Sequence, residues 1–132
     1  MALRFLAKVL IITIFIAAGI NKFNTVETTK GMIKGSLNRF DRFLTDNGCK
    51  DGLPFKTELL DNTENLVYFV GVAEFGGGLA VLNGLNFVGY LLALMVFGFT
   101  AMVHNPWFEY KTEADTRFNI EMAFFNLCII AV

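Results

Sequence analysis

The fold of this chain is decided by residues 66–103, which read LVYFVGVAEFGGGLAVL, then NGLN, then FVGYLLALMVFGFTAMV. Glu74 is the single charged side chain in this run, so neither half has the polar face that a soluble helix needs. Each half approaches the length that crosses a bilayer core, for which about 17 helical residues is a workable minimum. Asn83-Gly84 is a strong turn signal. We therefore expect a tight hairpin of two transmembrane helices, over about 66–82 and 87–103.

Two more apolar stretches flank this hairpin, at about 3–20 and about 118–132, and Pro106 separates the hairpin from the second of them. Of the 132 residues, 55% are hydrophobic and 17% are charged, whereas about 25% are charged in a typical soluble domain. Backbone groups in lipid must be satisfied within each segment, and none of the stretches alternates as a barrel strand does. We expect an all-α integral membrane four-helix bundle, a single domain over residues 1–132. The alternative, a soluble bundle with a very apolar core, would need a polar face that residues 66–103 lack.

The connector between the first two spans, residues 22–64, is polar, with seven Lys or Arg and seven Asp or Glu. Apolar residues inside it recur at helical spacing, which predicts one amphipathic helix over about 28–46. Thr28 or Thr29 could cap its start, and Asn47-Gly48 is typical of a left-handed stop. Such a helix either lies at the membrane surface and caps the bundle, or serves as a plain connector packed on the rest of the protein.

Topology follows from counting the crossings of four spans. The two chain ends and the turn at 83–86 share one side with two Lys or Arg, and the connector and the 104–117 loop share the other side with nine. The positive-inside rule then places the connector in the cytoplasm or the mitochondrial matrix. The mitochondrial inner membrane is the leading localisation, with the bacterial plasma membrane or the endoplasmic reticulum as alternatives. Residues 3–20 also resemble a signal or import segment, but we expect them to be retained as the first span.

Glu74 is the most informative residue, because a charge at the centre of a span costs about 2.5–3.5 kcal/mol. We expect it to be protonated, paired or directed into the bundle. Gly71 and Gly78 share its helix face and Gly77 adjoins them, so these small residues would let another helix approach closely. Glu74 is either a functional carboxyl, for a proton relay or a quinone headgroup, or a structural carboxyl bonded across helices.

His104 and Glu121 are the other polar candidates near the membrane, both on the side of the connector. No His-x-x-His or Glu-x-x-His spacing supports a metal site, and Glu74 would lie about 12 Å deeper, so no metal is expected. We expect His104 to cap a helix end beside an interfacial aromatic anchor made of Trp107, Phe108 and Tyr110. No disulfide is expected between Cys49 and Cys128.

Three short motifs lie at or near span ends or within a span: Ala18-Gly19-Ile20-Asn21-Lys22-Phe23, Glu74-Phe75-Gly76-Gly77-Gly78-Leu79 and His104-Asn105-Pro106. With them the chain resembles the DoxX family of small four-helix membrane proteins and, more distantly, the surfeit-locus cargo receptors of the endoplasmic reticulum. The resemblance implies a four-helix fold more firmly than an activity. Some members of the family resemble or accompany subunits of membrane oxidoreductases that reduce quinone. The charged stretch over 26–64 is longer than the family's usual first connection.

The function we expect is that of a non-catalytic accessory subunit of a larger membrane complex, with a respiratory-chain oxidoreductase assembly as the first choice. The sequence shows no nucleophile and base pair, phosphate loop or dinucleotide motif. Eleven basic against twelve acidic residues leave no cationic surplus for nucleic acid. The expected partners are membrane lipids and other membrane subunits, without a resident cofactor but with quinone or bound lipid as possible ligands. The alternatives are a quinone-linked oxidoreductase component that uses Glu74, and a membrane cargo receptor.

Overall fold

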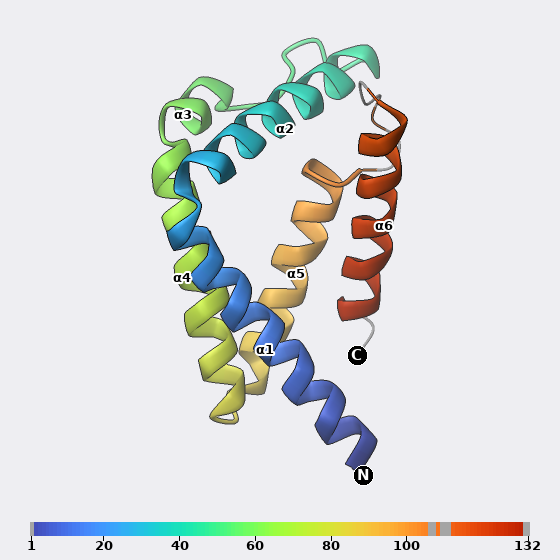
Figure 1. The fold of residues 1–132 in the computed structure, drawn as a ribbon. Helices are drawn as coiled ribbons and strands as arrows, with labels where there is room; N and C mark the ends of the chain where they lie inside the picture. Colours follow the sequence, from blue (N-terminus) through green and yellow to red (C-terminus); the bar gives the residue numbers. More distant parts are fainter. Residues whose placement is uncertain (1, 106–107, 109–111, 131–132) are drawn as a thin grey trace.

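The computed structural model describes residues 2–105, 108 and 112–130 of the chain. These residues form six helices and no strand (Figure 1), so the prediction of an all-α chain is confirmed for the part that is described. The helices are α1 (Ala2–Asn24), α2 (Val26–Asp46), α3 (Lys56–Asp61), α4 (Thr63–Leu82), α5 (Asn86–Met102) and α6 (Glu113–Ile130).

Helices α1, α4, α5 and α6 coincide with the four apolar stretches of the sequence, and their ends differ from the expected ones by a few residues. The largest difference is at α6, which begins five residues before the expected residue 118. Thr112 explains this start, because its Oγ accepts a bond from the Asp115 backbone N–H (3.1 Å) and donates one to the Asp115 carboxylate (2.8 Å). The first turn of α6 is therefore polar and precedes the apolar part.

The amphipathic helix α2 follows α1 after a single residue, Thr25, whose φ of −125° and ψ of 37° bend the chain. The prediction that Thr28 or Thr29 caps the start of this helix is therefore wrong, because both residues lie inside α2. The expected stop is confirmed: Gly48 has a φ of 97°, and the Cys49 N–H reaches back to the Leu44 carbonyl at 2.9 Å.

Helix α2 lies across one end of the bundle, over α4 and toward α6 (Figure 1). On it, Phe40 and Phe43 pack against Phe108, with ring centroids 6.3 and 5.5 Å apart. Phe108 is thus buried under α2 rather than facing a membrane interface, which corrects the aromatic anchor expected there. Trp107 and Tyr110 lie outside the described residues.

The short helix α3 was not anticipated, because the chain around it is held by distant partners. Asp41 of α2 accepts bonds from the Leu53 backbone N–H (2.8 Å) and from Lys56 (2.7 Å), and these contacts lower the pKa of Asp41. Lys30 of α2 pairs with Glu64 at the start of α4 at 3.0 Å, and both Glu64 and Glu27 raise the pKa of Lys30. The polar connector is therefore a folded layer that is tied to the bundle.

The most extensive helix packing joins α1 to α4, which run antiparallel (Figure 1). A Cβ atom on Gly19 would lie 2.7 Å from the Gly71 carbonyl oxygen, so the two backbones touch. Gly71 and Gly78 face α1, where added Cβ atoms would meet Phe23 and Ile16 at 3.0 and 2.9 Å. Gly77 faces α5 instead, because its Cβ would lie 2.9 Å from Leu92.

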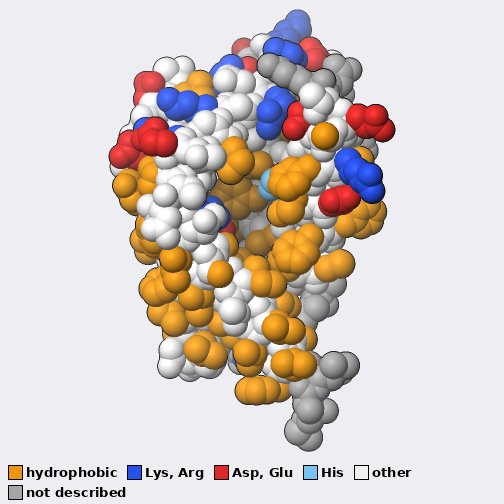
Figure 2. Space-filling view, viewed as in Figure 1, with side chains coloured by type: hydrophobic (Ala, Val, Ile, Leu, Met, Phe, Trp, Pro, Cys, Tyr) orange, Lys and Arg blue, Asp and Glu red, His pale blue; other side chains and the backbone are white. Residues whose placement is uncertain are grey.

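Many large apolar side chains of the helices are exposed. The buried core is small and joins α1 to α4 and α5, through Ile12, Phe15, Val81, Leu92 and Val96. Among the described residues, two helices are long and apolar enough to cross a membrane, judged by length and composition. They are α1 over Phe5–Asn24, of which 17% is buried, and α4, of which 28% is buried. α5 is a shorter apolar helix. In Figure 2 hydrophobic side chains cover the body of the molecule, and charged ones gather at the end near α2. This pattern indicates association with a membrane.

Candidate functional site

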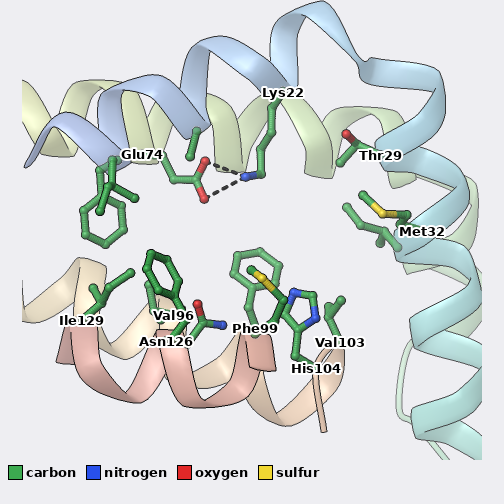
Figure 3. Close-up of a pocket in the computed structure, with 16 residues that line it drawn as sticks. Lys22, Thr29, Met32, Glu74, Val96, Phe99, Val103, His104, Asn126 and Ile129 are labelled. Carbon is green, nitrogen blue, oxygen red and sulfur yellow. Dashed lines mark hydrogen bonds and ion pairs between the residues drawn. The ribbon is translucent and has the colours of Figure 1, made fainter. Parts of the chain in front are cut away.

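Glu74 is paired with Lys22 of α1. The Lys22 ammonium lies 2.7 and 2.8 Å from the two carboxylate oxygens of Glu74 (Figure 3). The Lys22 side chain is 22% exposed and that of Glu74 is 9% exposed. In any α-helix the Cα–Cβ bonds tilt toward the N-terminus of that helix. Because α1 and α4 run in opposite directions (Figure 1), the side chains of Lys22 and Glu74 tilt in opposite directions and therefore toward each other. Of the states expected for Glu74, the structure shows the paired one.

Lys22 was not recognised as the partner because it was assigned to the polar connector. Helix α1 continues to Asn24, which places Lys22 in its last turn, where a cation also complements the helix dipole. The sequence did hold a signal, since Gly19 and Lys22 have the same three-residue spacing as Gly71 and Glu74. Each helix thus carries a small residue for close approach and, one turn later, a charge. Gly19 was likewise missed as a packing residue.

An open cavity of about 270 Å³ lies beside this ion pair, lined by residues of α1, α2, α4, α5 and α6 (Figure 3). Figure 2 shows the hollow from outside, with blue and red atoms in its depth and the pale blue histidine at its edge. Its walls are mainly apolar, and the polar residues that line it are Lys22, Thr29, Glu74, His104 and Asn126. The cavity brings together residues from all three sequence motifs: Ala18 and Lys22 from the first, Glu74 from the second and His104 from the third.

His104 joins the end of α5 to α6 rather than capping a helix. Its Nδ1 lies 2.9 Å from Oδ1 of Asn119, and Asn119 Nδ2 donates to the Asp115 carbonyl at 2.8 Å, which orients the amide. Burial lowers the pKa of His104, the bond to Asn119 partly opposes this, and the charge of Arg39 lowers the pKa further. The ring is therefore neutral at pH 7, with the proton assigned to Nδ1 and with Nε2 as an acceptor.

Asn126 of α6 contributes an acceptor in the same way. Its Nδ2 donates to Thr100 Oγ1 of α5 at 3.0 Å, and that hydroxyl donates to the Val96 carbonyl at 2.8 Å. The amide orientation is thus fixed by α5, and Oδ1 is the atom left to accept a bond. Asn126 was not among the predicted site residues, because a lone Asn in an apolar helix has no distinguishing spacing.

Glu121 lies apart from this site. It is exposed and pairs with Arg117 one turn earlier on α6, at 3.2 Å. His104 lines the cavity and Glu121 does not, and the described residues contain no cluster of three or more His, Cys, Asp or Glu side chains that could hold a metal ion. Cys49 and Cys128 are exposed free thiols.

Comparisons with family models, with curated proteins and with solved structures gave no match to this chain. The resemblance to the DoxX family therefore rests on the three sequence motifs.

Proposed function

We propose that this chain is an integral membrane protein that crosses the bilayer four times, with α1, α4, α5 and α6 as its spans. The exposed apolar side chains support this proposal, since large residues on every one of these helices face outward. Examples with the exposed fraction of each are Phe5 (71%), Phe69 (70%), Leu94 (68%) and Phe124 (66%). Soluble monomers rarely expose such continuous apolar surface. α5 has 17 residues. It extends about 25 Å at 1.5 Å per residue, close to the thickness of the hydrocarbon core.

Within the membrane, we infer that the chain acts as a non-catalytic accessory subunit of a larger complex. The observation that carries this inference is the aromatic surface, because Phe87, Phe97, Phe118 and Phe124 are all more than half exposed. Aromatic side chains are enriched where proteins meet one another, and rigid rings lose little conformational entropy on packing. The sequence resemblance favours a respiratory oxidoreductase assembly in the mitochondrial inner membrane as the host, with the bacterial plasma membrane and the endoplasmic reticulum as the other locations.

Native gel electrophoresis after extraction in a mild detergent tests the accessory role. We expect the chain to migrate with a large assembly and to be recovered with other membrane subunits. Extraction with alkaline carbonate serves as the control, and the chain should stay in the membrane fraction. A chain that stays in the membrane but migrates only as a small free protein would contradict the accessory role and leave membrane insertion intact.

The cavity favours a second candidate function, a quinone-linked oxidoreductase component. In that role the Lys22 and Glu74 pair would handle a proton near a headgroup, with His104 at the opposite wall. Glu74→Gln should then abolish quinone-dependent turnover without disturbing assembly. Glu121→Gln is the matched control, because that carboxyl is exposed, pairs with Arg117 and does not line the cavity. Unchanged turnover in Glu74→Gln would reject this candidate.

A further inference from the structure

We propose that the cavity beside Lys22 and Glu74 binds the polar head of a neutral, hydroxyl-bearing lipid-soluble molecule whose chain extends into the surrounding lipid. The inference rests on the membrane insertion proposed above and specifies the ligand class of the same cavity. Four properties of the cavity support it: the direction of access, the balance of charges, the hydrogen-bonding groups and the volume.

Access to the cavity is from the side of the bundle. Thr29, Met32 and Ile33 of α2 line the cavity and close it at the end where the charged residues gather. The hollow is visible on the lateral face in Figure 2, among hydrophobic side chains. That face would lie in the hydrocarbon region of a bilayer, so the ligand would enter from lipid rather than from water.

The charge balance of the cavity favours an uncharged head. The Lys22 ammonium is already neutralised by the Glu74 carboxylate through two bonds, and His104 is neutral at pH 7. An added anion would compete with Glu74 for the one ammonium, and an added cation would compete with Lys22 for the one carboxylate. Either would leave an uncompensated charge in a low-dielectric site, which is costly.

The hydrogen-bonding groups of the cavity favour a hydroxyl. An ammonium has three donors, and Lys22 uses two of them on Glu74 among the described contacts. His104 Nε2 and Asn126 Oδ1 have no described partner and can only accept in the states assigned above. A hydroxyl both donates and accepts, so it can accept from Lys22 and donate to one of these two atoms. A carbonyl can only accept, and it would leave both acceptors without a partner.

The size of the cavity favours a head rather than a whole ligand. At about 270 Å³ it is just below the 300–1,000 Å³ of pockets that enclose complete drug-sized molecules. Phe15, Val96, Phe99 and Met122 supply apolar walls that suit the first carbons of a chain. The remainder of the chain would stay outside, among the lipids.

Photolabelling of the full chain in phosphatidylcholine vesicles tests this inference, with a diazirine-bearing octadecanol as the probe. We expect labelling at cavity residues that are not exposed on the outer surface, such as Val96, Phe99 and Met122, mapped by mass spectrometry. Oleyl alcohol should displace the probe, whereas oleic acid, decylubiquinone and octadecene should each compete about tenfold more weakly, the value of one well-made hydrogen bond. Stronger competition by oleic acid would overturn the neutral class. Equal competition by decylubiquinone would overturn the hydroxyl assignment and favour the quinone candidate.

Two neighbouring alanines give matched variants for this experiment. Ala18 lines the cavity and Ala17 is exposed on the same helix. Ala18→Phe should fill the cavity and reduce its labelling about tenfold, and Ala17→Phe should leave labelling unchanged. Equal labelling in the two variants, or labels found only on outward-facing residues, would overturn the inference. Carbonate extraction of the same samples separates the two proposals: retention in the membrane without cavity labelling overturns this inference alone, and loss from the membrane overturns both.

Discussion

The ion pair between Lys22 and Glu74 joins two charged groups that are largely withdrawn from solvent. Each charge alone would be costly at this depth, and together they satisfy one another through bonds of 2.7 and 2.8 Å. Desolvation still opposes such a pair, so its net contribution to the free energy of unfolding is small. The penalty appears when one partner is removed and the other remains buried. A variant that removes one charge should therefore be less stable than a variant that removes both charges.

Lys22→Met should lower the free energy of unfolding by about 3 kcal/mol, because it leaves the Glu74 carboxylate without its partner. Lys22→Met combined with Glu74→Met should recover most of this loss, since it removes both charges. Unfolding by sodium dodecyl sulfate in mixed micelles would measure both effects. Lys34→Met is the control, because Lys34 is exposed on α2. Equal stability of wild type and Lys22→Met would show that the pair is absent in solution.

His104 should make stability depend on pH. Its folded pKa is lowered, chiefly by burial, from the ordinary value of 6.5. The unfolded chain therefore takes up a proton more readily than the folded chain as pH falls below about 6.5. The contribution of neutral His104 to the free energy of unfolding is fully present above that pH. Below it, the free energy of unfolding declines by at most about 1.4 kcal/mol per pH unit for one proton.

Thermal unfolding in detergent between pH 7.5 and 5.5 would measure this decline, with His104→Gln as the matched variant. Gln can still donate to Asn119 and has no proton to take up in this range. The variant should therefore show a flatter profile, and identical slopes for the two proteins would exclude His104 as the group responsible.

At the scale of elements, the contact between α1 and α4 organises the bundle. Without water between helices in lipid, association depends on close packing, and glycine permits the closest approach. Gly19 lies directly against the backbone at Gly71 and Phe75, where no side chain can move aside. Gly76, on the same helix as Gly71, has open space around the position of a Cβ. The two glycines are therefore predicted to respond oppositely to the same substitution.

Gly19→Ala should destabilise the fold by about 1–3 kcal/mol, because its Cβ would lie 2.7 Å from the Gly71 carbonyl oxygen and force the helices apart. Gly76→Ala should be neutral or stabilising by up to about 1 kcal/mol, since alanine is the better helix former. The same detergent titration measures both. A neutral Gly19→Ala would mean that α1 does not pack on α4 through this surface.

At the scale of the whole molecule, the charges and the apolar surface are separated. α2 and the connector carry ion pairs such as Lys56 with Asp41 at one end, and apolar side chains cover the body below them (Figure 2). A bilayer parallel to α2 would fit this separation, with the Asn83-Gly84 turn at the opposite surface. The expected turn is present, and Gly84 within it has a left-handed φ of 93°.

The proposed topology predicts that Cys49 and the turn at Asn83 lie on opposite sides of the membrane. Cys49 is exposed on the connector and Asn83 is exposed at the turn. Two single-cysteine proteins test this: Cys128→Ser, which keeps Cys49, and the triple variant Cys49→Ser/Cys128→Ser/Asn83→Cys, which has its thiol at the turn. A membrane-impermeant maleimide applied to intact vesicles should label one of these two proteins and not the other. The positive-inside rule places Cys49 on the cytoplasmic or matrix side. Labelling of both from one side would contradict the four-span arrangement.

The sequence by itself determined the four long apolar helices and the amphipathic helix α2, the turn at Asn83-Gly84, the stop at Gly48 and the fact that Glu74 requires compensation. These features depend on apolar length and on turn chemistry within a few residues. Only the tertiary structure decided that Lys22 compensates Glu74, that His104 bonds to Asn119, and that α3 forms. The physical reason is that the partners are distant in sequence: Lys22 and Glu74 are 52 residues apart, and His104 and Asn119 are 15 apart. They meet only in the folded chain, where the helix lengths, the bend at Thr25 and the glycine contacts between helices fix their positions. The cavity is a product of that same packing, since five helices contribute to its walls.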